Sequence, residues 1–291
     1  MAGSGDPVRV ILAALFANLS IAIAKFVAYA FTLSSSMLAE AFHSVADTGN
    51  QVLMLLGVKR AQKPADEEHP YGYGKESYFW SFVVALSIFI LGAAFAFYEG
   101  THKLLEIMSG HQAEIPDQTI AIVVLVVGFC VEGASLWIAA KEYRRTMGDI
   151  SFRQSLRESR AAALVTVLFE DAAACLGLLI ALAGVILVSM TGNLIFDVIA
   201  TYLIGVLLCV VAAFLGYMTK KLLIGQSAGA SVRQRIMVSL SDVPGVECVV
   251  DAKTLHMGSD VIILNLDVDF EDMLTTNELE KVIHDLESRA K

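Results

Sequence analysis

Charge, proline and cysteine are scarce in this sequence. Charged residues make up 18% of the 291 residues, five residues are proline and four are cysteine. Soluble domains carry about 25% charged residues, so the composition excludes an ordinary soluble domain. The cysteines form no CxxC pair, which excludes the common zinc-finger and redox spacings and predicts no disulfide. Phosphate loops and HExxH are absent too, and we find nothing in the sequence that points to an enzyme.

What is abundant is apolar sequence. Hydrophobic residues make up 56% of the chain and the mean hydropathy is +0.64, which is typical of a membrane protein. The first apolar stretch is full length and lacks a clear cleavage site, so we interpret it as a span rather than a signal peptide. Six stretches are each long enough to cross a bilayer, and every proline falls outside them: Val8–Phe31, Ser35–Val58, Tyr78–Tyr98, Thr119–Ala140, Ala161–Met190 and Asp197–Met218. The sequence therefore predicts an all-α membrane domain of six transmembrane helices in residues 1–221.

The basic residues lie almost entirely on one side of this predicted domain. The opposite side carries only Lys103. By the positive-inside rule we expect a multi-pass protein with both termini in the cytoplasm, in a bacterial-type inner (plasma) membrane. The net charge of −9 argues against nucleic acid as a partner and is compatible with cations.

Residues 222–291 have a different character and predict a small cytoplasmic α+β domain. The expected order is helix, strand, strand, helix, over Ser231–Ser241, Val246–Leu255, Val261–Glu271 and Thr275–Ala290. Two strands leave both sheet edges open, and a domain of this size is marginally stable alone. We therefore expect a homodimer that packs through this domain and the transmembrane helices.

The second stretch carries a row of polar residues. Glu40, His43, Asp47 and Asn50 follow one another at spacings of three, four and three, which places them on one face of a helix. Ionisable groups in a bilayer are costly, so such a row is a functional hypothesis by default. Histidine and aspartate four residues apart are suited to grip a dication such as zinc. The alternative is that the pair only joins two helices.

Two adjacent acids in the fifth stretch are further candidate ligands. Because neighbouring helix positions point about 100° apart, one of Glu170 and Asp171 can face a pore while the other faces a neighbouring helix. We expect Asp171 to be the third ligand, with Glu170 and Asn50 as further ligands; a helix-pairing role is the alternative. Glu132 in the fourth stretch could carry protons or pair with Lys25.

One imidazole and two carboxylates suit Zn²⁺ as the transported substrate, although Mn²⁺, Fe²⁺, Co²⁺ or Cd²⁺ would also be admitted. Outside the spans, His69 in HPYGYGK could bind a metal at the cytoplasmic mouth, and a solvated turn is the favoured alternative. Asp267 and Asp269 could hold regulatory cations, and a solvent-facing strand edge is favoured over that.

The chain resembles the cation diffusion facilitator family, which includes the mammalian zinc transporters. The resemblance rests on SSSMLAEAFHSVADTGNQ, HPYGYGKESYFWSF, DVIATYLIGVLL and LLIGQSA. It implies six helices, a dimer, cytoplasmic termini, a metallochaperone-like C-terminal domain, and export of divalent cations, mostly zinc, in exchange for protons. The tail is similar to a truncated form of that domain, without the final strand of many relatives.

The resemblance also implies the ligand positions, and one of them departs from the family. His43 and Asp47 match the pair on the second helix, and Asp171 matches one residue of the fifth-helix pair. The other position is Val167, which cannot bind a metal. With LFED in the fifth helix, this pattern is similar to the branch containing the mitochondrial member of the mammalian set. Two other functions stay open, namely a passive cation channel and a metal sensor or scaffold that does not transport.

Overall fold

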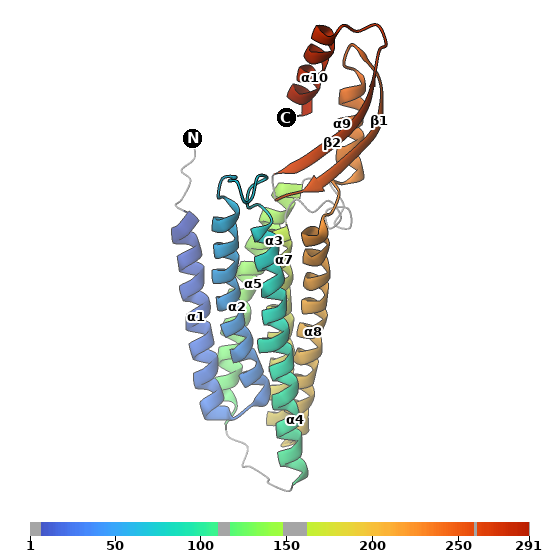
Figure 1. The fold of residues 1–291 in the computed structure, drawn as a ribbon. Helices are drawn as coiled ribbons and strands as arrows, with labels where there is room; N and C mark the ends of the chain where they lie inside the picture. The colour runs from blue at the N-terminus through green and yellow to red at the C-terminus, as the bar shows by residue number, and fades with distance from the viewer. Residues whose placement is uncertain (1–6, 110–116, 148–161, 259–260, 291) are drawn as a thin grey trace.

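A bundle of long helices carries a smaller lobe at one end (Figure 1). The computed structural model describes residues 7–109, 117–147, 162–258 and 261–290. The bundle is made of α1 (Pro7–Thr32), α2 (Ser35–Ala61), α3 (Glu76–Ser87), η1 (Ile88–Ala94), α4 (Phe95–Met108), α5 (Thr119–Met147), α7 (Ala162–Thr191) and α8 (Ile195–Ile224). The lobe is made of α9 (Ala230–Ser241), β1 (Val246–His256), β2 (Ile262–Phe270) and α10 (Thr276–Ala290).

The bundle is that of an integral membrane protein. Among the described residues, four helical segments are long and apolar enough to cross a membrane: Glu76–Met108, Thr119–Lys141, Val165–Thr191 and Ile195–Ile224. α2 has 27 residues, enough to span, but its polar row makes it less apolar than these four. The fold is thus mostly helical with a small sheet, as predicted, while the number of six spans stays a prediction.

The third rod of the bundle, made of α3, η1 and α4 in succession, is longer than the sequence predicts. We expected it to end at Tyr98 and a loop to begin at Glu99, but the helix continues to Met108. This prediction was wrong because the hydropathy of the sequence falls after Tyr98, whereas side-chain pairs continue to stabilise the helix beyond that point. Glu106 lies 3.8 Å from His102 and 3.5 Å from Lys103, and such pairs stabilise a helix end. The rod also widens into the π-helical segment η1 in its middle.

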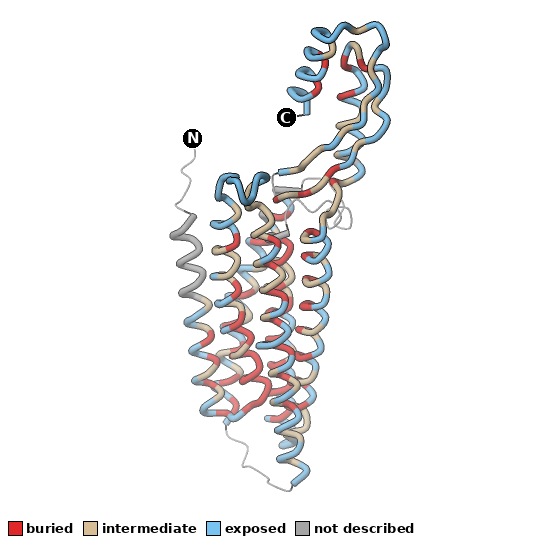
Figure 2. Tube along the Cα trace, in the orientation of Figure 1, coloured by how far each residue is buried: buried red, intermediate tan, exposed pale blue. Residues whose placement is uncertain are grey.

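Buried residues run along the inner sides of the helices (Figure 2). α2 lies among α1, α3, α7 and α8, so its inward face is enclosed by other helices. Small residues let the helices approach closely, as is common in membrane bundles. A Cβ at Gly184 of α7, for example, would lie 2.6 Å from the Cβ of Ala200 on α8.

The start of α2 is held by a carboxylate from α8. Asp197 is buried and accepts hydrogen bonds from the hydroxyls of Ser34 at 2.7 Å and Ser36 at 2.5 Å. It also accepts the backbone N–H groups of Ser35 at 2.6 Å and Ser36 at 3.1 Å. Helix N-termini favour such an anion because their first N–H groups have no partner within the helix. We call this set of contacts the Asp197 clamp.

The lobe is a two-stranded antiparallel sheet with two helices. β2 alternates as predicted, with Asn265, Asp267 and Asp269 more exposed than their neighbours. The apolar side chains of the sheet pack with α9 and α10 around Leu240, Val243, Val246, Val282 and Leu286. At its near end the β-hairpin contacts the loop after α2: a Cβ added at Gly74 would collide with the backbone of Met257.

Candidate functional site

The polar row of α2 faces the interior of the bundle. Glu40 and Asn50 are fully buried, His43 is 1% exposed, and the side chain of Asp47 is 14% exposed. The i, i+3 and i, i+4 spacings give this common face, as the sequence predicts. The row runs from near the start of α2, at the end of the bundle far from the lobe, toward the lobe (Figure 1).

His43 and Asp47 lie together without forming a hydrogen bond. The His43 Nδ1 and Asp47 Oδ1 atoms are 3.5 Å apart, and neither ring nitrogen has a hydrogen-bond partner among the described residues. Asp47 Oδ1 and Asn50 Oδ1 are likewise buried without a partner. Buried polar atoms without partners are costly and call for an explanation. A ligand bound at these atoms would supply the missing partner.

Glu170 and Asp171 point to different helices. Asn50 Nδ2 donates to Glu170 Oε1 at 2.8 Å, so Glu170 reaches the row on α2. Asp171 instead accepts a hydrogen bond from Ser135 of α5 at 2.8 Å. This is the divergence expected for adjacent helix positions. Glu170 is therefore the acid on α7 that contacts the polar row. The sequence predicted Glu170 only as a further ligand beside Asp171.

The expected ligands do not yet form a closed site. No three His, Cys, Asp or Glu side chains in the described parts of the chain stand close enough together to hold an ion. Asp171 is partly exposed, and Val167 lies one turn before it with an apolar side chain. His43 and Asp47 thus stand without a third metal-ligating side chain close to both of them among the described residues.

Lys25 was not predicted as part of the site. It is fully buried on α1, and its ammonium donates to Glu40 Oε2 at 2.9 Å and to Ser44 Oγ at 2.7 Å. Lys25 thus pairs with Glu40 rather than with Glu132. The Glu40 carboxylate, the first member of the predicted polar row, is held by this ammonium. The position of Lys25 within an apolar stretch was a signal that it has a buried partner. The spacing of residues along the sequence could not show that this partner is Glu40.

The loop candidate, His69, is solvent-exposed. His69 Nδ1 lies 3.7 Å from Asp66 Oδ1, and the Tyr73 hydroxyl donates to Asp66 Oδ2 at 2.7 Å. The hydrogen bond to Asp66 raises the pKa of Tyr73 to about 12, and the same bond lowers the pKa of the Asp66 carboxyl. These contacts describe an ordered turn, which supports the alternative to a metal site.

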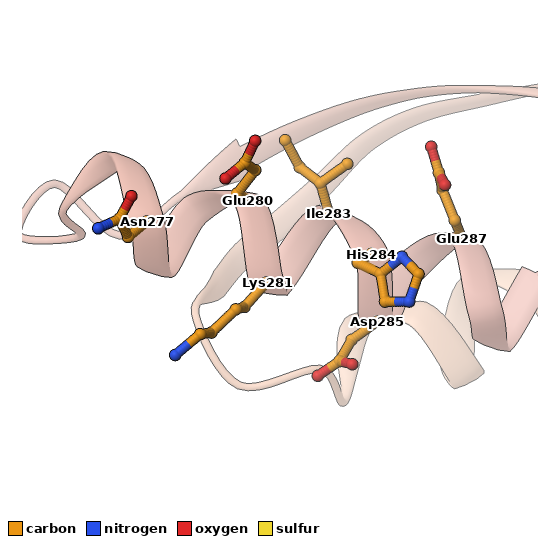
Figure 3. Close-up of a pocket in the computed structure, with 7 residues that line it drawn as sticks. All are labelled: Asn277, Glu280, Lys281, Ile283, His284, Asp285 and Glu287. Carbon is orange, nitrogen blue, oxygen red and sulfur yellow. The ribbon is translucent and has the colours of Figure 1, made fainter.

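The lobe candidates are exposed as well. Asp267 and Asp269 lie on β2 opposite Asp251 and Cys248 of β1. The lobe carries an open surface groove of about 680 Å³ along α10, where His284 stands beside acidic side chains (Figure 3). Neither place brings three metal-ligating side chains together within the described residues.

The family follows from comparison with known proteins. A family model described as the cation efflux transmembrane domain matches residues 11–224, which include the whole polar row and its partners on α1 and α7. The chain therefore belongs to the cation diffusion facilitator, or cation efflux, family. This confirms the resemblance read from the sequence, and it makes the chain a member of a transporter family rather than of an enzyme family.

Within that family the chain lies near the SLC30A9 proteins. It is 35% identical over 283 residues to "Proton-coupled zinc antiporter SLC30A9, mitochondrial" of Xenopus laevis, covering 96% of this chain and 50% of that protein. It is 31% identical to "Metal tolerance protein C4" of Arabidopsis thaliana, covering 94% of this chain and 59% of the relative. It is 27% identical to "Cation-efflux pump FieF" of Shewanella oneidensis, covering 89% and 80%. The chain spans about half the length of the vertebrate relatives it matches.

Proposed function

We propose that this protein exports divalent cations, zinc first among them, in exchange for protons. The observation that carries the proposal is the buried polar row of α2, with unpartnered nitrogen and oxygen atoms on His43 and Asp47. Family membership supports it, and so do the names of the relatives, which include a proton-coupled zinc antiporter and a cation-efflux pump.

His43, Asp47 and one acid of α7 form the transport site in this proposal. A cation enters from the partly exposed side near Asp47 and Asp171, and His43 and Asp47 bind it when they are deprotonated. Glu170 or Asp171 completes the shell, with Asn50 oriented by its bond to Glu170. Protons arriving from the opposite side compete for the same atoms and release the cation. Alternating access then requires two states of the bundle whose balance the ligands shift.

Several broader features belong to the same proposal. Residues 1–221 form the transport domain with six spans, and residues 222–291 form a cytoplasmic domain. The protein is a homodimer joined through that domain and the membrane helices, because a two-stranded sheet leaves edges to cover. Both termini lie on the cytoplasmic side of a bacterial-type inner (plasma) membrane. The Shewanella relative is bacterial, whereas the SLC30A9 relatives carry "mitochondrial" in their names.

The test is zinc flux into vesicles that contain the purified protein and a zinc-sensitive dye. An imposed pH gradient should drive zinc accumulation against its own gradient in the wild type. The double variant His43→Ala with Asp47→Ala should lose this flux, because two of the ligands are gone. The matched control is His102→Ala with Glu106→Ala, an exposed pair of the same i, i+4 spacing at the end of α4.

Three outcomes would contradict the proposal. Coupled flux that survives loss of both His43 and Asp47 would remove the site assignment. Flux that ignores the pH gradient would indicate a channel. Zinc binding to the lobe without any flux would indicate a sensor or scaffold.

A further inference from the structure

Lys25 is held in the bundle by three acceptors. Its Nζ atom donates to Glu40 Oε2 at 2.9 Å, to Ser44 Oγ at 2.7 Å and, more weakly, to the Glu40 backbone carbonyl at 3.4 Å. An ammonium group has three N–H donors, so each has a partner. Both Lys25 and Glu40 are fully buried, and this placement fixes one positive charge inside the bundle.

The surrounding helices leave room for this pair. A Cβ added at Gly177 of α7 would collide with Glu40 Oε1, so the absence of a side chain at Gly177 leaves room for that carboxylate. A Cβ at Gly128 of α5 would lie 3.9 Å from Lys25 Cε. The pair is therefore enclosed by α1, α2, α5 and α7, and two of these helices, α2 and α7, also carry the proposed transport site.

The ammonium lies at the far end of the polar row. Glu40 comes seven residues before Asp47 on α2, or about 10 Å along the helix axis toward its start. Beyond Glu40 the inward positions are the buried Met37 and Ser36, and the Asp197 clamp closes the helix start. In the other direction Asp47 is partly exposed. A cation that enters at Asp47 and moves along the row toward the far end meets Lys25.

We propose that Lys25 is an electrostatic barrier that prevents a bound dication from leaking through the far end of the bundle. This inference rests on the proposed transport function. The ammonium repels an approaching dication and neutralises Glu40, the next carboxylate on which the ion could rest. The ion then leaves through the far end only when the bundle rearranges and the Lys25–Glu40 pair moves aside. Because protons release the cation in the proposed transport cycle, its exit is coupled to protons.

A purely structural role for the pair makes a different prediction. If Lys25 and Glu40 only join α1 to α2, removing either one breaks the same contact and lowers flux in the same way. If Lys25 is a barrier, the two removals differ, because only the loss of Lys25 raises the leak. Lys25→Met removes the positive charge and frees a carboxylate, whereas Glu40→Gln breaks the ion pair and keeps the positive charge.

The experiment measures downhill zinc flux into vesicles without a pH gradient and with the membrane potential held at zero. Lys25→Met should raise this leak about tenfold or more over the wild type. Lys25→Arg, which keeps the charge, should leak as the wild type does. Glu40→Gln should leak no more than the wild type. The double variant Lys25→Met with Glu40→Gln should leak less than Lys25→Met, because the resting carboxylate is gone.

The results separate this inference from the proposed function. Wild-type protein without proton-driven zinc uptake would remove the proposed function itself. Normal coupled uptake in the wild type, with a Lys25→Met leak equal to that of the wild type, would overturn the barrier alone. An equal leak from Lys25→Met and Glu40→Gln would overturn it too. Should Lys25→Met fail to elute as a folded protein, the double variant, which buries no unpaired charge, tests the same point: its leak must exceed that of Glu40→Gln.

Discussion

The Asp197 clamp predicts that one carboxylate on α8 contributes a large share of the stability of the bundle. Asp197→Ala removes the acceptor of four hydrogen bonds, two from hydroxyls and two from backbone N–H groups. It also leaves the first N–H groups of α2 unpaired in a buried place. A hydrogen bond to a charged group contributes about 1.5–3 kcal/mol, and truncating one partner of a buried charged network costs about 3–5 kcal/mol.

Because the four bonds share one carboxylate, their contributions do not simply add. We therefore expect Asp197→Ala to lower the free energy of unfolding by about 4 kcal/mol. At about 2–4 °C per kcal/mol for a chain of this size class, the midpoint of thermal unfolding should fall by roughly 8–16 °C. The measurement is thermal unfolding of the purified protein in detergent, followed by tryptophan fluorescence.

A graded control is available at the same helix start. Glu99 accepts one hydrogen bond there, from Ser35 Oγ at 2.9 Å. Glu99→Gln should therefore cost about 1 kcal/mol, a shift of a few degrees. The clamp would be refuted if Asp197→Ala unfolded within about two degrees of the wild type, or if it shifted the midpoint no more than Glu99→Gln does.

Two further predictions concern the loop after α2. Gly74→Ala should lower the unfolding midpoint and expose the lobe to proteolysis, because the new Cβ would collide with Met257. The control is Gly133→Ala, which has nothing within 4 Å of its Cβ and should be neutral or slightly stabilising. Equal behaviour of the two variants would contradict the contact between Gly74 and Met257. Titration of phenolate absorbance should show Tyr73 ionising near pH 12, and Asp66→Asn should bring its pKa back toward the ordinary value of 10.0. Because this pKa is raised on folding, the contribution of the bond is present at neutral pH and lost as pH rises through about 12; an unchanged titration in Asp66→Asn would refute the bond.

Much of the local structure could be predicted from the sequence. Apolar length places the long helices, and the period of two places β2, because both patterns report which face of an element is buried. The strand Val261–Glu271 was expected, and β2 spans Ile262–Phe270. The third rod was the exception. Hydropathy marks where apolar sequence ends, and a polar helix can continue past that point to Met108.

The candidate site was predictable only along one helix. Spacing alone put Glu40, His43, Asp47 and Asn50 on one face, since that depends on helix geometry and nothing else. Which acid of α7 meets this face depends on how α7 is rotated against α2, and that is set by packing across the whole bundle. The Asn50–Glu170 bond joins residues 120 positions apart, so no local pattern encodes it.

The same limit explains the charged contacts that were missed. Lys25 and Glu40 lie 15 residues apart across a turn, and each on its own looks like an isolated charge in an apolar stretch. Asp197 looks like the ordinary start of an apolar helix, although it holds residues more than 160 positions earlier. The burial pattern of a single stretch does not show which distant polar group a buried residue pairs with.

The distance between Asp197 and the serines has a consequence for how the protein is made. During synthesis the start of α2 emerges 162 residues before the carboxylate that will bind it. Until α8 enters the bilayer, α2 carries both a polar row and the backbone N–H groups of Ser35 and Ser36 without the carboxylate that binds them, so it is poorly suited to remain in lipid by itself. Its final seating is therefore a late event of biogenesis, completed only when the last helix of the bundle has left the ribosome.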